Sequence, residues 1–365
     1  MKTGIITYHS AYNFGSVLQA YATQKTLEKL GYEAEIINYR MPSQKEFYDA
    51  RPSGLKGYIK ELLYVGRHDD LKKRKTLFEN FINHELRLTE EVREPEEAIE
   101  QFQKYEVMIS GSDQIWNKHS NELKNVDWKY MKPYLLERFT GRKISYASSI
   151  VNMTDSELDV IKKSLLRFET ISCREQNASE RLKKLLKREI STVCDPTFLI
   201  DGEEWKKNFV KEKNAADDYV LIYSLGNFKE TQKIIREAHN KFKKSKIVVL
   251  APLVPVINFY GVQIITAAGP VEFLNYINNA KLVITNSYHG TLFSINLKKQ
   301  FFFLDNVNKK DARVTQVLGK MGLQKQIITG IQNIEEISRV DYRAVKGKLE
   351  QYRAESLTYL KNALK

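Results

Sequence analysis

Residues 4–39 read GIITYHSAYNFGSVLQAYATQKTLEKLGYEAEIINY, a stretch in which two β-branched runs enclose a helical pattern. The first run, at 4–8, leads into a polar loop, after which Leu18 and Leu27 contribute to an apolar helix face. The second run lies at 34–39. This order of strand, loop, helix and strand is typical of a parallel βαβ unit. The opening of the chain therefore predicts an α/β fold.

The same alternation continues along the chain. Short β-branched runs separate longer helical patterns, as in parallel sheets covered by helices. The predicted strands lie at 4–8, 34–39, 107–110, 144–148, 171–173 and 192–194, and then at 219–224, 246–250, 262–266, 282–285 and 301–304. Ligands of open α/β sheets bind beyond the carboxyl ends of the strands. We therefore predict two Rossmann-like domains that face a cleft.

The length of the chain supports two domains, since 365 residues are about 2.4 times the rough 150-residue expectation for one domain. The segment 201–218 is polar, charged and poor in periodicity, so it is the best connection between them. This places the N-terminal domain at 1–200 and the C-terminal domain at 219–335. The remaining segment, 336–365, is predicted to be helical and either packs as a terminal helix or crosses back to the first domain.

Composition and charge narrow the class of protein. A 42% apolar share with 11% aromatic residues is enough for folded cores. The 58 Lys and Arg residues exceed the 45 Asp and Glu residues by 13, which favours phosphates, anionic lipid surfaces or acidic substrates as partners. Two cysteines without a CxxC pair argue against a disulfide framework and fit a reducing cytosol. The N-terminus lacks the features of a signal peptide.

Two segments raise the question of a membrane. Residues 247–271 contain 25 positions without a formal charge, but Pro252, Pro255 and Pro270 interrupt them, which favours strand, loop, strand over a spanning helix. Residues 51–75 carry eight Lys or Arg against three acids and end in KKRK at 72–75. Such a basic amphipathic segment either covers a sheet or lies on an anionic membrane, and the covering helix is favoured. No nucleic-acid-binding motif accompanies the charge.

The first loop, HSAYNFG at 9–15, follows a predicted strand and precedes a predicted helix. Gly15 and Ser16 at the start of that helix offer backbone donors to an anionic substrate, although neither GxGxxG nor GxxxxGK[ST] is present. The structural alternative is that Asn13 and Ser16 cap the helix, as such residues commonly do. We predict Asn13, Gly15 and Ser16 as substrate-binding residues.

Two further loops of the first domain carry candidate residues. The loop GSDQIWN at 111–117 provides Ser112, Asp113 and Trp116 as candidates for substrate binding. The indole of Trp116 can stack on a sugar, and the alternative is a buried aromatic anchor. In SCRE at 172–175, Arg174 is suited to hold a carboxylate or phosphate in a bidentate manner, and the alternative is an ion pair with Glu175. Cys173, in the same run, is predicted to be a buried structural thiol.

The strongest local signal lies at 283–291, VITNSYHGT, where an apolar strand ends in a polar turn. His289 is predicted to begin a helix, to face the cleft and to exchange protons near neutral pH. Gly290 allows a close approach to the backbone. The other substrate-binding candidates of this turn are Asn286, Ser287 and Tyr288.

These loops, in this order, resemble the polysaccharide pyruvyl transferase family. The fragments that carry the resemblance are the opening 4–39, GSDQIWN at 111–117, SYASSI at 145–150, SCRE at 172–175, CDPTFLI at 194–200 and ITNSYHGTLFSI at 284–295. The histidine of the family's HG motif maps onto His289, and the arginine of its S-x-R-[DE] motif maps onto Arg174. Two positions depart from the family's pattern. Asn13-Phe14-Gly15-Ser16 replaces a glycine-rich loop ending in Gly-Asp, and Lys299-Gln300 replaces Lys-Pro.

The resemblance implies a GT-B-like architecture and a cytoplasmic enzyme that transfers pyruvate from phosphoenolpyruvate to a sugar hydroxyl pair. It implies His289 and Arg174 as catalytic residues, no metal, no cofactor, and a sugar acceptor that is lipid-linked if the protein works at the inner face of the membrane. Two alternatives stay open. One is a glycosyltransferase that uses a nucleotide sugar, and the other is a noncatalytic glycan-binding assembly protein.

Overall fold

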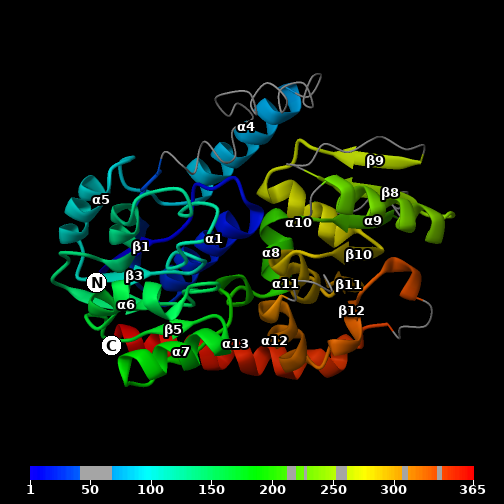
Figure 1. Cartoon of the computed structure of the whole chain (residues 1–365). Helices are drawn as coiled ribbons and strands as arrows, with labels where there is room; N and C mark the ends of the chain where they lie inside the picture. Colours follow the sequence, from blue (N-terminus) through cyan, green and yellow to red (C-terminus); the bar gives the residue numbers. More distant parts are fainter. Residues whose placement is uncertain (42–67, 212–218, 226–227, 252–260, 306–310, 335–338) are drawn as a thin grey trace. The chain divides into compact units, whose positions relative to one another are not determined.

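The computed structural model describes residues 1–41, 68–211, 219–225, 228–251, 261–305, 311–334 and 339–365 (Figure 1). The chain forms two compact units. Unit 1 comprises Met1–Ser53, Asn80–Leu199 and Gln351–Lys365, and unit 2 comprises Gly54–Glu79 and Ile200–Glu350. Both units are discontinuous in sequence, whereas the predicted domains are continuous stretches.

Unit 1 is built on a parallel sheet. Its four strands lie in the order β2 (Glu33–Ile36), β1 (Lys2–Ile6), β3 (Val107–Ser110) and β4 (Arg142–Ser145). The short parallel pair β5 (Ser172–Cys173) and β6 (Ser191–Thr192) continues beyond β4 through a parallel bridge between Ser148 and Cys173. The direction of strand order reverses between β1 and β3. This switch point is where an open α/β sheet usually binds its ligand.

The helices of unit 1 enclose this sheet. They are α1 (Phe14–Lys29), α5 (Pro95–Gln101), α6 (Asp155–Leu165) and α7 (Gln176–Leu186), with shorter 3-10 turns η1 (Phe102–Lys104), η2 (Trp128–Leu135) and η3 (Pro196–Phe198). Their apolar side chains join a core that includes Trp116, Phe168 and Leu182. Helix α1 is buried along most of its length, because the side chains from Phe14 to Gln24 are all covered.

Unit 2 contains a six-stranded parallel sheet. Its order is β12 (Ile327–Ile328), β11 (Phe301–Leu304), β10 (Leu282–Thr285), β7 (Tyr219–Tyr223), β8 (Lys246–Leu250) and β9 (Val262–Ile265). Counted from the first strand of the unit, this is the doubly wound Rossmann order, with its switch point between β7 and β10. Strand β7 is buried throughout, as expected for a parallel strand covered on both faces.

Helices cover both faces of the unit 2 sheet. On one face, α9 (Phe228–Lys241) and η5 (Ile331–Asn333) bury Ile235 and Ile331 in a core with Ile222. On the other face, Phe273 of α10 (Pro270–Asn279) packs against Tyr223 and against Phe293 of α11 (Tyr288–Asn296). Unit 2 also contains α12 (Ala312–Met321) and the 3-10 turn η4 (Gln324–Gln326).

The predicted connection at 201–218 differs from the structure. Residues Gly202–Phe209 form helix α8, and the fully buried Trp205 packs edge-on against Phe293 with ring centroids 5.2 Å apart. Two aromatic residues four positions apart, Trp205 and Phe209, give this charged helix the apolar side that holds it in unit 2. Residues 212–218 of the predicted connection lie outside the described residues.

The sequence boundaries between the units fall inside two helices, α4 (His68–Glu85) and α13 (Tyr342–Leu364). The end of α13 belongs to unit 1, where the Tyr352 hydroxyl donates to the Val193 carbonyl and the Cys194 N–H donates to Ser356 Oγ. In the last turn of α13, the carbonyls of Ala363 and Leu364 accept hydrogen bonds from Arg142. Of the two alternatives for 336–365, crossing back to the first domain is therefore observed.

Every predicted strand has a counterpart in the structure, and among the residues that the structure describes only β12 was not predicted. The uncharged segment 247–271 contains most of β8 and all of β9, the two strands predicted there, and its residues 252–260 lie outside the described residues. Within the described part of the chain, no helix combines the length and apolar character needed to cross a bilayer.

Candidate functional site

The switch point of unit 1 brings the loops after β1 and β3 side by side. Asn13 caps helix α1, because its Oδ1 accepts hydrogen bonds from the N–H groups of Gly15 (2.9 Å) and Ser16 (3.4 Å). The backbone donors predicted to bind an anion are thus engaged by the Asn13 side chain. This arrangement is the capping alternative.

The Ser16 side chain does not cap the helix but binds the loop after β3. Its hydroxyl donates to Oδ2 of Asp113 over 2.7 Å, and Oδ1 of the same carboxylate lies 3.6 Å from Nη2 of Arg174. Ser16, Asp113 and Arg174 are 3%, 6% and 2% exposed. Three residues that the sequence singled out therefore form one buried network at the switch point of unit 1.

Arg174 faces carboxylates of the protein itself. Its Nη1 donates to Asp195 over 3.0 Å and its Nε donates to Glu175 over 3.1 Å, in addition to the contact with Asp113. The prediction that this guanidinium holds the substrate's acidic group differs from the structure, because the buried cation already has three anionic neighbours. Arg174 is in position to orient Asp113 rather than to present a bare positive charge.

Ser112 supports the same loop from behind. It is fully buried, its hydroxyl donates to the Ala147 carbonyl over 2.7 Å, and its N–H donates to Oε1 of Gln19. Gln19 also donates to Thr7 Oγ1 and thereby ties α1 to β1 and β3. Sequence reasoning did not single out Gln19, because a buried amide inside a helix has no motif that marks it.

Trp116 is a buried anchor. The indole is 0% exposed, its Nε1 donates to the Tyr134 carbonyl over 2.9 Å, and its ring meets Phe168 edge-on. The prediction that it stacks on a sugar therefore fails, since no face of the indole is accessible. An indole whose N–H has a partner is a common way to fill a core.

The switch point of unit 2 is organised by the turn after β10. Oδ1 of Asn286 accepts the Leu225 N–H over 2.7 Å and so joins the loops that follow β7 and β10. Ser287 caps α11 by accepting the Gly290 N–H, and its own N–H donates to Thr285 Oγ1. These hydrogen bonds fix the turn that carries His289.

His289 lies in the first turn of α11, as predicted, and its side chain is half-buried. Its ring meets the buried ring of Tyr288 edge-on, with centroids 5.2 Å apart. The Arg313 guanidinium stacks on the same Tyr288 ring at 5.2 Å and forms a two-pronged pair with Asp311. A titratable ring and a guanidinium thus share one aromatic neighbour.

Arg313 contacts the turn at His289 but was not predicted from the sequence. It lies in α12, 24 positions after His289, and it is followed by an ordinary amphipathic helix pattern. The signal that was available is Asp311, which also caps α12 by accepting the Arg313 N–H. An arginine held by a carboxylate and an aromatic face is oriented for recognising phosphate or carboxylate groups.

Gly290 is required by packing within unit 2. A Cβ at this position would lie 2.6 Å from Thr285 Oγ1 and 3.0 Å from a ring carbon of Tyr223. The glycine therefore lets the start of α11 approach β10 and β7 closely. The groups that approach Gly290 belong to the protein, and its role in substrate binding stays a prediction.

The basic run at 72–75 does not form one charged face. Lys72, Lys73 and Lys75 are exposed, whereas Arg74 is 3% exposed and stacks on Phe78 with the guanidinium carbon 4.7 Å from the ring centre. The helical period turns Arg74 inward.

Burial raises the pKa of Tyr223 to about 12, while a hydrogen bond with Ser287 and the positive charge of Arg74 lower it.

Both cysteines are buried in unit 1. Burial raises the pKa of Cys194 to about 11 and raises the pKa of Cys173 well above its ordinary value. The prediction of Cys173 as a buried thiol is confirmed. Among the described residues, no group of three His, Cys, Asp or Glu side chains is placed to hold a metal ion.

The family follows from a match of the sequence to the polysaccharide pyruvyl transferase profile over residues 13–308. The chain belongs to the polysaccharide pyruvyl transferase family. The matched region includes Asp113 and Arg174 of unit 1 and His289 of unit 2. Comparison with curated protein sequences gives no match.

Solved structures place this polysaccharide pyruvyl transferase family member in the GT-B-like class. UDP-GlcNAc 2-epimerase from Neisseria meningitidis, bound to UDP-GlcNAc, is 10% identical with a TM-score of 0.55 over 100% of this chain and 99% of the epimerase. The Methanocaldococcus jannaschii enzyme, in complex with UDP-GlcNAc and UDP, is 13% identical with a TM-score of 0.51 over 100% and 99%. A putative UDP-N-acetylglucosamine 2-epimerase from Listeria monocytogenes is 11% identical, with a TM-score of 0.53 over 98% of this chain and 90% of the epimerase. Such identities show the fold alone and confirm the predicted architecture.

Proposed function

We propose that this family member transfers the pyruvyl group of phosphoenolpyruvate to two hydroxyls of a sugar in a cell-surface polysaccharide precursor and releases phosphate. The observation that carries the proposal is the turn at His289, within a chain that matches the pyruvyl transferase family over 13–308. There, a half-buried imidazole and the Arg313 guanidinium both contact Tyr288. This combination suits a donor that carries phosphate and carboxylate groups.

The atoms of the reaction balance without a redox or metal cofactor. The enol methylene of phosphoenolpyruvate takes one proton and becomes a methyl group. Two sugar hydroxyls each form a bond to the central carbon and lose their protons, while the bond from that carbon to the phosphate oxygen breaks. One of the two protons released compensates for the proton taken by the methylene, and the other leaves with the phosphate.

His289 is suited to move a proton in this sequence. An imidazole is a common choice for delivering a proton in catalysis or for stabilising a departing phosphate. We assign one of these two roles to His289. The Asn286 and Ser287 hydrogen bonds restrict the turn, which keeps the ring in place between binding events.

Arg313 is assigned to hold the donor's anionic groups in unit 2. Its guanidinium is oriented by Asp311 and by the face of Tyr288, so little freedom is lost when an anion binds. Arg174, which the family resemblance implies as a catalytic residue, is assigned a positioning role through Asp113 because its own contacts are with Asp113, Glu175 and Asp195.

The acceptor sugar is assigned to the switch-point loops of unit 1. Asp113 accepts a hydrogen bond from Ser16, and a carboxylate held in this way is suited to accept a second hydrogen bond from a sugar hydroxyl. Phosphoenolpyruvate is a cytoplasmic metabolite, so we place the reaction in the cytoplasm. A lipid-linked acceptor would bring the protein to the inner membrane face, where exposed Lys72, Lys73 and Lys75 suit an anionic surface.

A glycosyltransferase that uses a nucleotide sugar is the second candidate, because the GT-B-like fold is shared with proteins whose structures contain UDP-GlcNAc. The two reactions release different products. The test is to incubate the full chain with sugar acceptors and either phosphoenolpyruvate or a nucleotide sugar, and to measure inorganic phosphate and nucleoside diphosphate. Acceptor-dependent phosphate release supports the proposal. Acceptor-dependent release of nucleoside diphosphate alone supports the glycosyltransferase, and ligand binding without either product supports a glycan-binding protein.

A further inference from the structure

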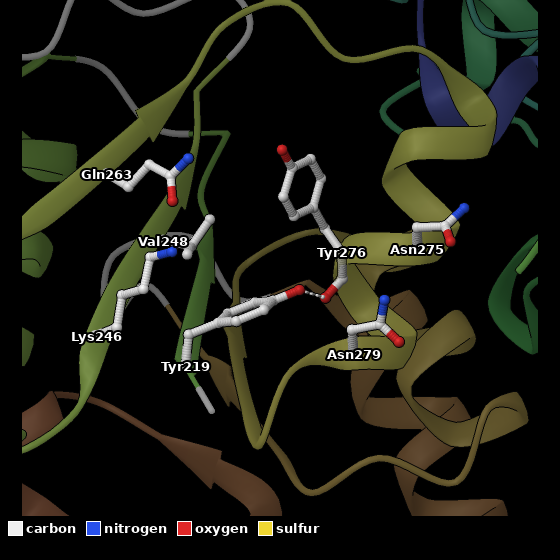
Figure 2. A pocket seen from close by; sticks show the side chains of 7 residues that line it. All are labelled: Tyr219, Lys246, Val248, Gln263, Asn275, Tyr276 and Asn279. Atoms are coloured by element: carbon white, nitrogen blue, oxygen red, sulfur yellow. Dashed lines mark hydrogen bonds between the residues drawn. The ribbon is translucent and has the colours of Figure 1, made fainter. Parts of the chain in front are cut away.

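A pocket of about 240 Å³ lies in unit 2 at the amino ends of strands β7 and β8 (Figure 2). Tyr219 and Lys246 are the first residues of these strands, whereas His289 follows the carboxyl end of β10. The five residues of β7 span about 13 Å, so the pocket is at the opposite edge of the sheet from the proposed catalytic turn. The pocket is therefore separate from that site.

The register of the sheet explains which side chains meet in the pocket. Tyr219 pairs with Lys246 in the parallel ladder, and Val248 pairs with Gln263. Paired residues and residues two apart point to one face, so all four side chains lie on the same face of the sheet. Figure 2 shows them opposite Tyr276, Asn275 and Asn279 of α10.

The walls of the pocket are held in place by hydrogen bonds. The Tyr219 hydroxyl donates to the Tyr276 carbonyl over 2.8 Å, which fixes one aromatic ring between the sheet and α10. The Asn275 amide donates to the carbonyls of Phe209 and Val271 and accepts the Lys211 N–H, so this residue shapes the wall. The Tyr219 ring is therefore a fixed part of the pocket wall and loses little side-chain freedom when a ligand binds.

The chemistry of the lining favours a sugar. Two tyrosines supply apolar ring faces for the C–H groups of a pyranose, and Gln263, Asn279 and Lys246 supply donors for its hydroxyl oxygens. A single lysine is a weak match for a nucleotide's phosphates, which proteins usually hold with several donors. The volume is below the roughly 300–1,000 Å³ of pockets for drug-sized ligands, so it suits one ring.

We propose that this pocket binds one sugar residue of a glycan chain, stacked on Tyr276 and hydrogen-bonded by Gln263 and Lys246. It provides a second attachment for a polysaccharide at a distance from the catalytic turn. The role as a polysaccharide anchor rests on the proposed function, but the binding of a sugar does not.

Saturation-transfer NMR with the full chain, without phosphoenolpyruvate, tests the pocket. The probes are short oligosaccharides of glucose, galactose, mannose, N-acetylglucosamine and glucuronic acid. At least one is expected to bind, and Gln263→Ala or Tyr276→Ala should weaken its affinity about tenfold. Asn279→Trp should abolish binding by filling the pocket. The matched control is Lys243→Ala, which removes an exposed lysine before β8 that does not line the pocket.

Two outcomes would overturn the proposal: no oligosaccharide binds the native chain, or binding is unchanged in Gln263→Ala, Tyr276→Ala and Asn279→Trp. Gln263 is exposed, so its replacement leaves the core intact and keeps the test decisive even if another variant fails to fold. Because the measurement omits phosphoenolpyruvate, a failure of the proposed reaction leaves the binding result standing. A failure of oligosaccharide binding in turn leaves phosphate release as an independent measurement.

Discussion

The Ser16 hydroxyl donates a 2.7 Å hydrogen bond to the Asp113 carboxylate, although 97 positions separate the two residues in sequence. The contact joins the helix that follows β1 to the loop that follows β3, the two strands on either side of the switch point in unit 1. Arg174 lies beside the other oxygen of Asp113. The buried network therefore orders the loops at the edge of the sheet where ligands of this fold class bind.

Replacing Arg174 should destabilise the protein strongly. Arg174→Ala leaves Asp113, Glu175 and Asp195 buried without their shared cation, so the free energy of unfolding should fall by about 3–5 kcal/mol in denaturant titration. The matched control is Arg181→Ala, which breaks an exposed pair with Asp155 and should cost less than about 1 kcal/mol. Equal losses in the two variants would contradict the assignment of Arg174 as the organising cation.

His289→Ala should lower turnover by roughly 10²-fold or more, because a general acid or base contributes about that much. The far-ultraviolet circular dichroism and the unfolding midpoint should change little, since the side chain is only half-buried. His119→Ala is the control, because His119 is exposed and pairs with Glu157 on the surface. Phosphate release near the native rate in folded His289→Ala would remove His289 from the catalytic assignment.

Arg313→Lys should raise the KM for phosphoenolpyruvate about tenfold. A lysine keeps the charge but loses both the two-pronged pair with Asp311 and the flat contact with Tyr288, so the cation is no longer oriented. Initial rates at varied donor concentration measure the effect. An unchanged KM in Arg313→Ala as well as in Arg313→Lys would show that the donor is held elsewhere.

Gly290→Ala should reduce stability by about 1–3 kcal/mol, as overpacking of a close contact usually does. The added Cβ would meet Thr285 Oγ1 at 2.6 Å, so the start of α11 must move away from β10. Gly347→Ala is the control, because a Cβ there has no neighbour within 4 Å and the residue lies inside helix α13. That replacement should stabilise the protein by up to about 1 kcal/mol. Stability changes of the same sign and size in both variants would argue against the close approach.

The two cysteines should be unreactive in the native protein at pH 8. The thiolate is the reactive form, and a pKa of about 11 leaves roughly one Cys194 in a thousand ionised at pH 8. Reactivity of Cys194 should therefore rise only as the pH approaches 11. Absorbance after addition of an aromatic disulfide reagent should reveal both thiols in denaturant and neither in the native state. Rapid native reaction of one thiol would contradict the burial.

Most of the fold was predictable from the sequence because its strands are β-branched runs covered on both faces. Strands such as β7 and β8 are almost wholly apolar, and their bounds match the prediction to within one residue. Strand β12, with only Ile327 and Ile328, was missed, whereas the equally short β5 and β6 lie at or next to the predicted runs 171–173 and 192–194. Helix α8 was missed because its charged residues outnumber the two aromatic residues that bury it.

The sequence predicted which loops carry the candidate residues, but not which other residues these side chains contact. The loops after β1, β3, β5 and β10 were identified because polar residues follow apolar strands. The partners of these residues depend on long-range folding: Arg174 meets Asp195 across the loops after β5 and β6, and Arg313 reaches Tyr288 from another helix. A sequence pattern cannot show which distant charges meet in this way, so the pair of Arg174 with its neighbour Glu175 was foreseen as an alternative, but the contacts with Asp113 and Asp195 were not.

The most direct test of the central claim is to run the reaction in D₂O with phosphoenolpyruvate and a panel of lipid-linked and nucleotide-linked sugars, and to follow the products by NMR. A pyruvyl transferase should give one phosphate for each new ketal, and the ketal methyl group should carry one deuterium because the enol methylene is protonated from solvent. His289→Ala should slow both signals together. If every acceptor leaves phosphoenolpyruvate intact while a nucleotide sugar is consumed with release of its nucleoside diphosphate, the chain does not catalyse pyruvyl transfer.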